Sequence, residues 1–294
     1  MSYQFNVKEN KKVRVIIDTD AACEADDQYA IVHALLTPRF IVRGIIAEQF
    51  NSPDRADSVE KSYAEVKRVL EIMSMEDIPV FRGYGGELSS AADIPESEGA
   101  DFIIKEALSD SVRPLFVLCQ GALTNVAIAL RKRPDISNKF TCIWIGGGVY
   151  EDGSLEYNLN NDFRAANTVF NSSAELWQVP MEAYRLVRVS YAELQNKVLP
   201  CGKIGKYLFD ELMAVGAAQD WPAGESWVLG DSPAPALAMD PGCGRYEMKS
   251  APFISEAKRC DGTLENRLIR VYTDIDSRFI LEDFFSKLSI FADM

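Results

Sequence analysis

Histidine is nearly absent from this sequence, because His33 is the only one among 294 residues. A mechanism that needs two histidines, or a transition-metal site built from several imidazoles, is therefore excluded. Closely spaced cysteine pairs are absent as well, since no two of the six cysteines form a CxxC motif or a metal-ligand spacing. We therefore expect reduced thiols at all six positions, which are Cys23, Cys119, Cys142, Cys201, Cys243 and Cys260.

Basic residues are also fewer than acidic residues. The chain has 31 Lys and Arg against 44 Asp and Glu, which gives a net charge of −13 and a pI near 4.7. Sequence-independent binding to nucleic acid or to an anionic membrane needs a basic surface, so neither is expected. No apolar run reaches 18 residues, and the first residues, MSYQFNVKENKK, have no apolar signal-peptide core. We therefore expect a cytoplasmic protein.

Predicted strands and helices alternate along the chain. The β-branched run at 13–18 predicts a buried strand, and helical spacing of apolar residues follows at 26–38. The alternation continues to an irregular, charged stretch at 242–270 and ends on a strand and a helix at 269–288. This order predicts an α/β fold with a mainly parallel open sheet, helices on both faces and a site at the carboxyl ends of the strands. No linker or repeat divides the chain, so we expect a single domain over residues 1–294.

Four aspartates lie close together where the first predicted strand gives way to a helix. They are Asp18, Asp20, Asp26 and Asp27, within the stretch VIIDTDAACEADDQYAI. A helix N-terminus stabilises one such charge by about 0.3–1 kcal/mol, which is too little for the whole cluster. A hard divalent cation with oxygen ligands, calcium or magnesium, would neutralise it. The alternative is that Asp26 and Asp27 only cap the helix while the other two are solvated.

Further motifs follow the aspartate segment DTD…DDQYAI in a fixed order. They are GIIAEQFN at 44–51, IPVFRG at 78–83, QGALTNVAIAL at 120–130, IWIGGGVY at 143–150, EYNLNNDFRAANTVF at 156–170 and GDSPAPALAMDP at 230–241. In its order, this series resembles the inosine–uridine nucleoside hydrolases, and its last motif also has the internal spacing of that family. The resemblance implies a Rossmann-like fold, calcium dependence, and hydrolysis of the bond between ribose and base in a ribonucleoside. It also implies a homodimer or a homotetramer and a role in purine or pyrimidine salvage.

The resemblance implies a calcium site and a base. The ligands would be the side chains of Asp20, Asp27 and Asp231 and the backbone carbonyl of Gln120. Asp20 would also activate the calcium-bound water that attacks the sugar, with Asn51 beside that water or the ribose. Such a reaction passes through an oxocarbenium-like sugar, whose developing positive charge is stabilised by flanking carboxylates.

The resemblance also implies the substrate contacts. Asp26 and Asn158 would bind the 2′- and 3′-hydroxyls of the ribose, and Glu156 the 5′-hydroxyl. The nucleobase end departs from the family, because Gly230 stands where many members have a histidine that protonates the leaving base. Loss of a general acid typically costs about 10²–10⁴-fold in rate. Trp227 lies close by in sequence and is expected to stack on the base or to surround it with apolar contacts.

The aspartate loop is a second departure. Five residues, AACEA, separate Asp20 from Asp26, two more than in the common family pattern. Extra loop length costs little free energy, so the cation site can persist while the pocket wall differs. We expect Cys23 to be a small filler, since no cation beside it in sequence lowers its pKa. Glu24 is expected to face water, with a contact to the substrate as the alternative.

A replacement for the missing proton donor is not obvious from the sequence. His33 lies on the predicted helix but is rotated away from its site-facing side, and we expect it to be packed or exposed. Some members of the superfamily lack the histidine, so activity is not excluded. The nearby groups that carry a proton are Glu24, Tyr150 and Tyr157.

Three other functions compete with a nucleoside hydrolase. A hydrophobic strand followed by Asp-x-Asp also opens the magnesium-dependent phosphatases of the haloacid dehalogenase type, although Ala21 follows the second aspartate where they have Thr or Val. A Rossmann dehydrogenase is disfavoured, because no GxGxxG follows the first strand. A calcium-dependent riboside-binding protein without turnover is the remaining alternative.

Overall fold

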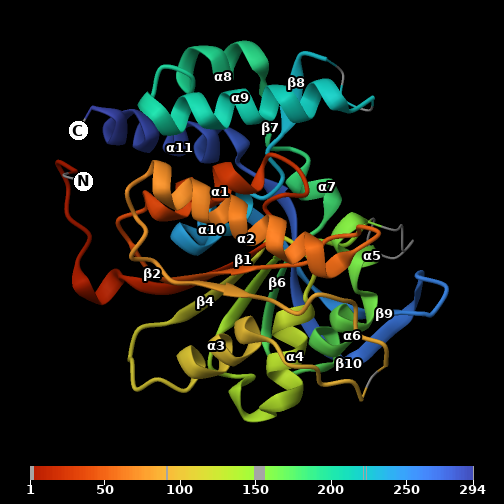
Figure 1. Cartoon of the computed structure of the whole chain (residues 1–294). Helices are drawn as coiled ribbons and strands as arrows, with labels where there is room; N and C mark the ends of the chain where they lie inside the picture. Colours follow the sequence, from red (N-terminus) through yellow and green to blue (C-terminus); the bar gives the residue numbers. More distant parts are fainter. Residues whose placement is uncertain (1–2, 91, 149–155, 221, 223, 294) are drawn as a thin grey trace.

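The computed structural model describes residues 3–90, 92–148, 156–220, 222 and 224–293. Its main feature is an eight-stranded sheet in the order β3-β2-β1-β4-β5-β6-β10-β9 (Figure 1). Neighbouring strands are parallel except for β10 and β9, which are antiparallel. The strands of this sheet are β1 (Val13–Thr19), β2 (Phe40–Ala47), β3 (Val80–Arg82), β4 (Leu115–Cys119), β5 (Thr141–Ile145), β6 (Glu175–Val179), β9 (Gly244–Ile254) and β10 (Cys260–Ile275). The expected mainly parallel α/β sheet is confirmed.

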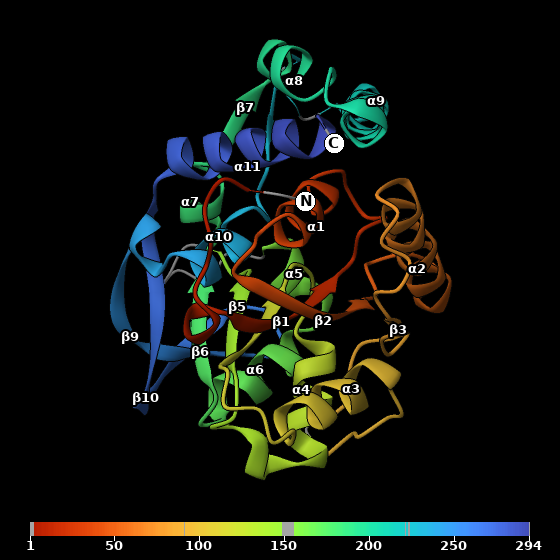
Figure 2. The same ribbon diagram turned by 90° about the vertical axis from the view of Figure 1, so that its left-hand side faces the viewer.

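Helices cover both faces of the sheet (Figures 1 and 2). One face carries α1 (Asp27–Leu35), α2 (Arg55–Ile72), α10 (Pro233–Met239) and α11 (Ser277–Ala292), and the other carries α3 (Glu98–Ala107), α4 (Thr124–Lys132) and α6 (Phe163–Asn171). Beyond α11 lie β7 (Arg188–Ser190) and β8 (Ser226–Val228), which form a small antiparallel sheet, with α8 (Tyr191–Lys197) and α9 (Gly202–Ala218). Two short helices, α5 (Tyr157–Asn161) and α7 (Met181–Tyr184), and three 3₁₀ turns, Glu9–Lys11, Pro134–Ile136 and Pro241–Cys243, complete the described elements. None of the described helices is both long and apolar enough to cross a lipid bilayer.

Strand β1 lies in the interior of the sheet, and all of its residues are buried. A parallel strand covered on both faces needs apolar side chains on both sides, which explains its β-branched sequence. Val15 and Ile17 pack into the core beneath α1 and α2, whereas Ile16 packs into the core on the α3 and α4 side. The aspartates that follow β1 are therefore held at the carboxyl edge by a rigid central strand.

The expectation that residues 242–270 are irregular is wrong. Residues 244–254 and 260–275 form β9 and β10, an antiparallel pair at the edge of the sheet. Much of β9 is exposed, and its sequence therefore lacks the apolar run that marks a buried strand. Charged residues on an edge strand also discourage pairing with other chains, which accounts for the misleading composition.

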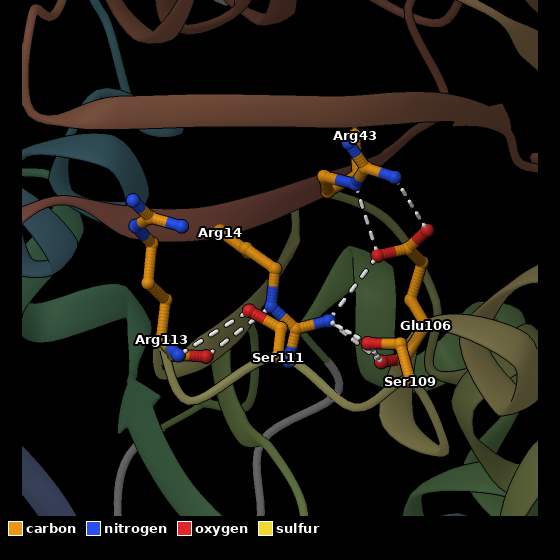
Figure 3. Close-up of polar contacts among 6 residues, drawn as sticks. All are labelled: Arg14, Arg43, Glu106, Ser109, Ser111 and Arg113. Atoms are coloured by element: carbon orange, nitrogen blue, oxygen red, sulfur yellow. Dashed lines mark hydrogen bonds and ion pairs between the residues drawn. The ribbon is translucent and has the colours of Figure 1, made fainter.

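A cluster of charged and polar side chains lies at the amino edge of the sheet (Figure 3). The aspartates lie at the opposite, carboxyl edge. Arg14 on β1 and Glu106 on α3 are both buried, and Arg14 Nη1 lies 3.2 Å from Glu106 Oε2. The same nitrogen donates to Ser109 Oγ at 2.6 Å, and Arg43 Nε donates to Glu106 Oε2 at 3.0 Å. The charges at this edge pair with one another, so removing one partner would leave the other buried without its counter-charge.

Candidate active site

A cavity lies at the carboxyl edge of the sheet and is lined mainly by acidic and other polar side chains. The loop after β1 and the start of α1 contribute one wall, the segment after β4 and the start of α5 a second, and α7 with the segment before α10 a third. The lining residues are Asp20, Cys23, Glu24, Asp26, Asp27, Gln120, Ile145, Glu156, Tyr157, Asn158, Tyr184, Gly230 and Asp231. Segments far apart in sequence thus meet where the topology of a parallel sheet predicts a site.

Three carboxylates in this cavity are close enough to share one cation. Asp26, Asp27 and Asp231 each offer an oxygen within 4.8 Å of those of the other two. The backbone N–H of Asp231 donates to Asp26 Oδ2 at 3.2 Å, and the hydroxyl of Thr19 donates to Asp27. Asp20 lines the same cavity, although it is not a member of this closest group. All three expected carboxylate ligands therefore line one cavity, and Asp26 lies among them.

The electrostatics of the cavity fit a hard divalent cation. Burial raises the pKa of Asp20, Asp27 and Asp231 well above the usual range, and neighbouring carboxylates raise it further. Burial also raises the pKa of Asp26, to about 6, against the lowering effect of backbone N–H groups. Buried carboxylates that repel one another in this way are stabilised by a cation, and an all-oxygen set of ligands is the kind that calcium and magnesium prefer.

Glu156 and Asn158 are fixed at the start of α5 by backbone groups. Glu156 caps the helix, and its Oε2 accepts from the N–H of Leu159 and the N–H of Gly147, both at 2.9 Å. The Asn158 amide donates at 2.9 Å to the backbone carbonyls of Gln120 and of Ile145. Because both amide protons of Asn158 are used, its side-chain oxygen is the group left for a ligand.

The inserted residues of the aspartate loop form part of the cavity wall. Glu24 is half-buried and lines the cavity, whereas the sequence favoured a position in water. Burial, followed by the charges of Asp26 and Glu156, raises the pKa of Glu24 to about 8. Cys23 donates to the hydroxyl of Tyr157 at 3.1 Å, and burial raises the pKa of its thiol. A protonated thiol in this position is consistent with the expected role of Cys23 as a filler.

Asp18 lies behind the cavity in a buried polar network. The amide of Asn125 donates to Asp18 Oδ1 at 3.1 Å and to Glu48 Oε2 at 2.7 Å. The oxygen of the same amide accepts from the hydroxyl of Ser97 at 2.8 Å. In this position Asp18 can support the aspartate loop from behind the cavity.

Two expected site residues do not reach the cavity. Asn51 is exposed on the chain after β2, and it is not among the described residues that line the cavity. Trp227 on β8 is buried in the apolar core and does not line the cavity either. His33 is packed away from the site as expected, since its Nε2 lies 2.7 Å from Asp283 Oδ2. Tyr150, named above as a proton carrier, lies outside the described residues.

Tyr184 and Glu48 were given no role by the sequence. Tyr184 lines the cavity from α7, and its position just after the carboxyl end of β6 is the signal that could have marked it. Glu48 follows the carboxyl end of β2 and is fully buried beside Asp18. A carboxylate directly after an apolar strand is the corresponding signal for Glu48.

Comparison with known families and structures favours one of the competing interpretations. The sequence profile described as inosine-uridine preferring nucleoside hydrolase matches residues 15–279. The chain belongs to this family. The match begins within β1 and ends in the first turn of α11, so it includes every lining residue of the cavity. The family and its enzyme class, hydrolases that act on N-glycosyl bonds, are those expected from the motifs, and the phosphatase hypothesis loses its support.

Curated relatives in this nucleoside hydrolase family include the pyrimidine-specific ribonucleoside hydrolase RihA of Salmonella typhi and of Salmonella typhimurium. Each is 26% identical over 207 residues, which covers 62% of this chain. The match spans 64% of the length of these relatives. The chain is thus similar to them over part of their length.

Solved nucleoside hydrolase structures resemble the whole chain. The purine-preferring ribonucleoside hydrolase from Gardnerella vaginalis superimposes with a TM-score of 0.80 at 20% identity, covering 95% of this chain and 99% of the other. The plant nucleoside hydrolase PpNRh1 superimposes with a TM-score of 0.77 at 20% identity, covering 94% and 99%. This likeness confirms the nucleoside hydrolase-like fold.

Proposed function

We propose that this protein hydrolyses the N-glycosidic bond of ribonucleosides, which yields ribose and a free base. The observation that carries the proposal is the buried acidic cavity at the carboxyl edge of the sheet, in a chain of the nucleoside hydrolase family. The proteins that it resembles include both a pyrimidine-specific and a purine-preferring ribonucleoside hydrolase, so the proposal covers both kinds of base.

The proposed cofactor is Ca²⁺. Its ligands are the side chains of Asp20, Asp27 and Asp231 and the backbone carbonyl of Gln120, which all line the cavity. When bound, the cation supplies positive charge that offsets the carboxylates and lowers the pKa of a water molecule. The repulsion among the buried carboxylates supports this assignment.

The side chains of the cavity have separate proposed roles. Asp20 accepts the proton of the attacking water, which makes that water a stronger nucleophile. Asp26 and the side-chain oxygen of Asn158 accept hydrogen bonds from the ribose 2′- and 3′-hydroxyls and orient the ring. Glu156 accepts a hydrogen bond from the 5′-hydroxyl. As the bond to the base breaks, Asp20 and Asp26 also stabilise the positive charge that develops on the sugar.

The nucleobase end of the cavity lacks an imidazole. Gly230 has no side chain with which to protonate the leaving base, and His33 is packed against Phe284, with ring centroids 5.8 Å apart. Glu24 and Tyr157, which are expected proton carriers, line the cavity, and so do Cys23 and Tyr184, which also carry an ionisable proton. We therefore expect faster turnover of ribosides whose leaving group needs no protonation.

A two-substrate assay tests the proposed function. Inosine or uridine is incubated with the protein and calcium while reducing sugar is measured, and a phosphomonoester is incubated in parallel while inorganic phosphate is measured. We expect reducing sugar and no phosphate. Release of phosphate without sugar would instead support a phosphatase. Saturable riboside binding with no sugar released from any riboside would support the non-catalytic alternative.

The proposal extends to the setting of the enzyme. We propose one domain over residues 1–294, acting in nucleoside salvage in the cytoplasm as a homodimer or a homotetramer. Cys23, Cys119, Cys142, Cys201 and Cys243 are free thiols in the structure, which is consistent with a reducing compartment. Light scattering of the purified protein measures the mass in solution and tests the assembly.

A further inference from the structure

Tyr184 contacts two parts of the cavity that are distant in sequence. It is the last residue of α7 and is half-buried, with its side chain in the cavity wall. Its hydroxyl donates to Glu156 Oε1 at 3.2 Å. The edge of its ring lies over Gly230, directly before Asp231. One side chain therefore connects the proposed 5′-hydroxyl site with the segment that carries a proposed cation ligand.

The ring of Tyr184 occupies space that a side chain at position 230 would need. A Cβ atom added to Gly230 would lie 3.1 Å from Tyr184 Cδ2 and 3.2 Å from Asp26 Oδ2. Both distances are shorter than ordinary van der Waals contact between such atoms, so one of the neighbours would have to move. Glycine at 230 and tyrosine at 184 are thus a matched pair in this chain.

The hydroxyl of Tyr184 donates to the oxygen of the Glu156 carboxylate that the two backbone N–H groups do not bind. Two backbone N–H groups hold Oε2, and Tyr184 holds Oε1. Gly147 connects the two segments, because its N–H donates to Glu156 and its carbonyl accepts from Met181 at the start of α7 at 2.9 Å. A carboxylate oxygen accepts more than one hydrogen bond, so Oε1 keeps capacity for a ligand while its orientation is fixed.

We propose that Tyr184 is the specificity-determining residue of the sugar subsite, which aligns Glu156 for a riboside that carries a free 5′-hydroxyl. Tyr184 acts through Glu156 and is thus a positioning residue. Its ring fills the part of the cavity wall next to Gly230, which has no side chain. The inference rests on the proposed function, since Glu156 is assigned there to the 5′-hydroxyl.

Paired substrates test the inference. The values of kcat and KM are measured for a nitrophenyl riboside and for its 5-deoxy analogue, with wild type and with Tyr184→Phe. We expect Tyr184→Phe to lower kcat/KM for the riboside about tenfold, mainly through KM, because a hydrogen bond to a charged group is lost. The analogue, which has no hydroxyl for Glu156, is expected to change less than about twofold. An equal loss for both substrates, or no loss for either, overturns the inference.

Tyr207→Phe is the matched control. Tyr207 also donates a hydroxyl to a glutamate, Glu65, but neither residue lines the cavity. This variant is expected to keep the wild-type ratio of kcat/KM between the two substrates.

A second pair of variants tests the steric match between Gly230 and Tyr184. Gly230→Ala is expected to lower kcat/KM strongly in the wild type and less in a Tyr184→Ala background. Equal losses in the two backgrounds count against the match.

Binding separates this inference from the proposed function. If the wild type hydrolyses no riboside, the proposed function fails, and calorimetric titration with methyl ribofuranoside and its 5-deoxy analogue in calcium decides the role of Tyr184. About tenfold weaker binding of the methyl ribofuranoside alone by Tyr184→Phe supports the inference. Equal affinities of both proteins for both ligands overturn it.

Discussion

At the scale of single residues, the cavity concentrates negative charge that the protein itself does not neutralise. Asp27 and Asp231 are 2% and 5% exposed, and burial together with repulsion from neighbouring carboxylates such as Asp26 raises the pKa of both. Bringing such groups together opposes folding, and a ligand that binds only the folded state offsets the cost. Cation binding and stability are therefore expected to be coupled through these aspartates.

Thermal unfolding with and without calcium tests this coupling. Calcium at about 100 times its Kd is expected to stabilise the wild type by about 2.7 kcal/mol, seen as a rise in Tm. Asp231→Asn removes a charged ligand and is expected to gain much less. Asp240→Asn, an exposed aspartate in the same sequence motif, serves as the control and is expected to respond like the wild type. Equal calcium-induced rises for wild type and Asp231→Asn would contradict the assignment.

The residues that were predictable from sequence are those whose partners are local or lie in recognisable motifs. The aspartates after β1 are anomalous within one short segment, and all of those named as cation ligands line the cavity. Tyr184 was not predictable, because its contacts with Glu156 and Gly230 depend on how β6, α5 and α10 meet in space. Asn51 was expected at the site from its position in a motif, but it is not among the described residues that line the cavity. A matching motif position does not by itself place a side chain in the cavity.

At the scale of elements, the last helix holds the two helices that follow the proposed cation ligands. On α11, Asp283 pairs with His33 of α1, and Lys287 donates to Thr37 Oγ1 at 3.0 Å and contacts Met239 Sδ at 2.9 Å. His33 is 1% exposed. Because α1 begins at Asp27 and α10 follows Asp231, this cluster stabilises the helices next to the proposed cation ligands.

The cluster predicts a loss of stability in mild acid. Burial, reinforced by the charge of Lys287, lowers the pKa of His33 from its ordinary 6.5, although Asp283 acts to raise it. As the pH falls below 6.5, the unfolded chain binds a proton at His33 that the folded protein does not, so folding stability falls. His33→Gln has no such proton site. Denaturant titrations at about pH 7.5 and about pH 5.5 are expected to show a larger loss for wild type than for this variant, and equal losses would refute the assignment.

Predictability at this scale follows burial. The strands at the centre of the sheet were predicted because each is an apolar run covered on both faces. Strand β9 and the first part of β10 were missed, because Tyr246, Met248 and Leu268 are exposed among charged neighbours and show no clean period. An edge hairpin has weaker constraints on its sequence than a central strand.

At the scale of the whole molecule, the two edges of the sheet differ in how their charged side chains are paired. No Lys or Arg is among the described residues that line the cavity at the carboxyl edge, whereas the amino edge holds the paired cluster of Arg14, Arg43 and Glu106. The length of the central strands separates the two, with the amino-edge residue Arg14 and the carboxyl-edge residue Asp18 near opposite ends of β1. Changes at the amino edge should thus affect stability without changing the chemistry.

Glu106→Ala tests this division. The variant leaves Arg14 buried without its carboxylate, which is expected to cost about 3–5 kcal/mol of unfolding free energy. The activity of the molecules that remain folded is expected to match the wild type. Glu60→Ala, which breaks the exposed ion pair with Arg82, is the control and is expected to change stability little. A drop in kcat of the folded Glu106 variant would show that the two edges are coupled.

The most direct measurement of the central claim is the rate of nitrophenol release from a nitrophenyl riboside in calcium. This leaving group needs no protonation, so the missing imidazole at Gly230 does not limit the reaction. We predict calcium-dependent hydrolysis by wild type and by Asp240→Asn, and loss of the reaction in Asp20→Ala and Asp231→Ala. Absence of nitrophenol release by wild type, or undiminished release by Asp20→Ala, would contradict the proposed function of the cavity.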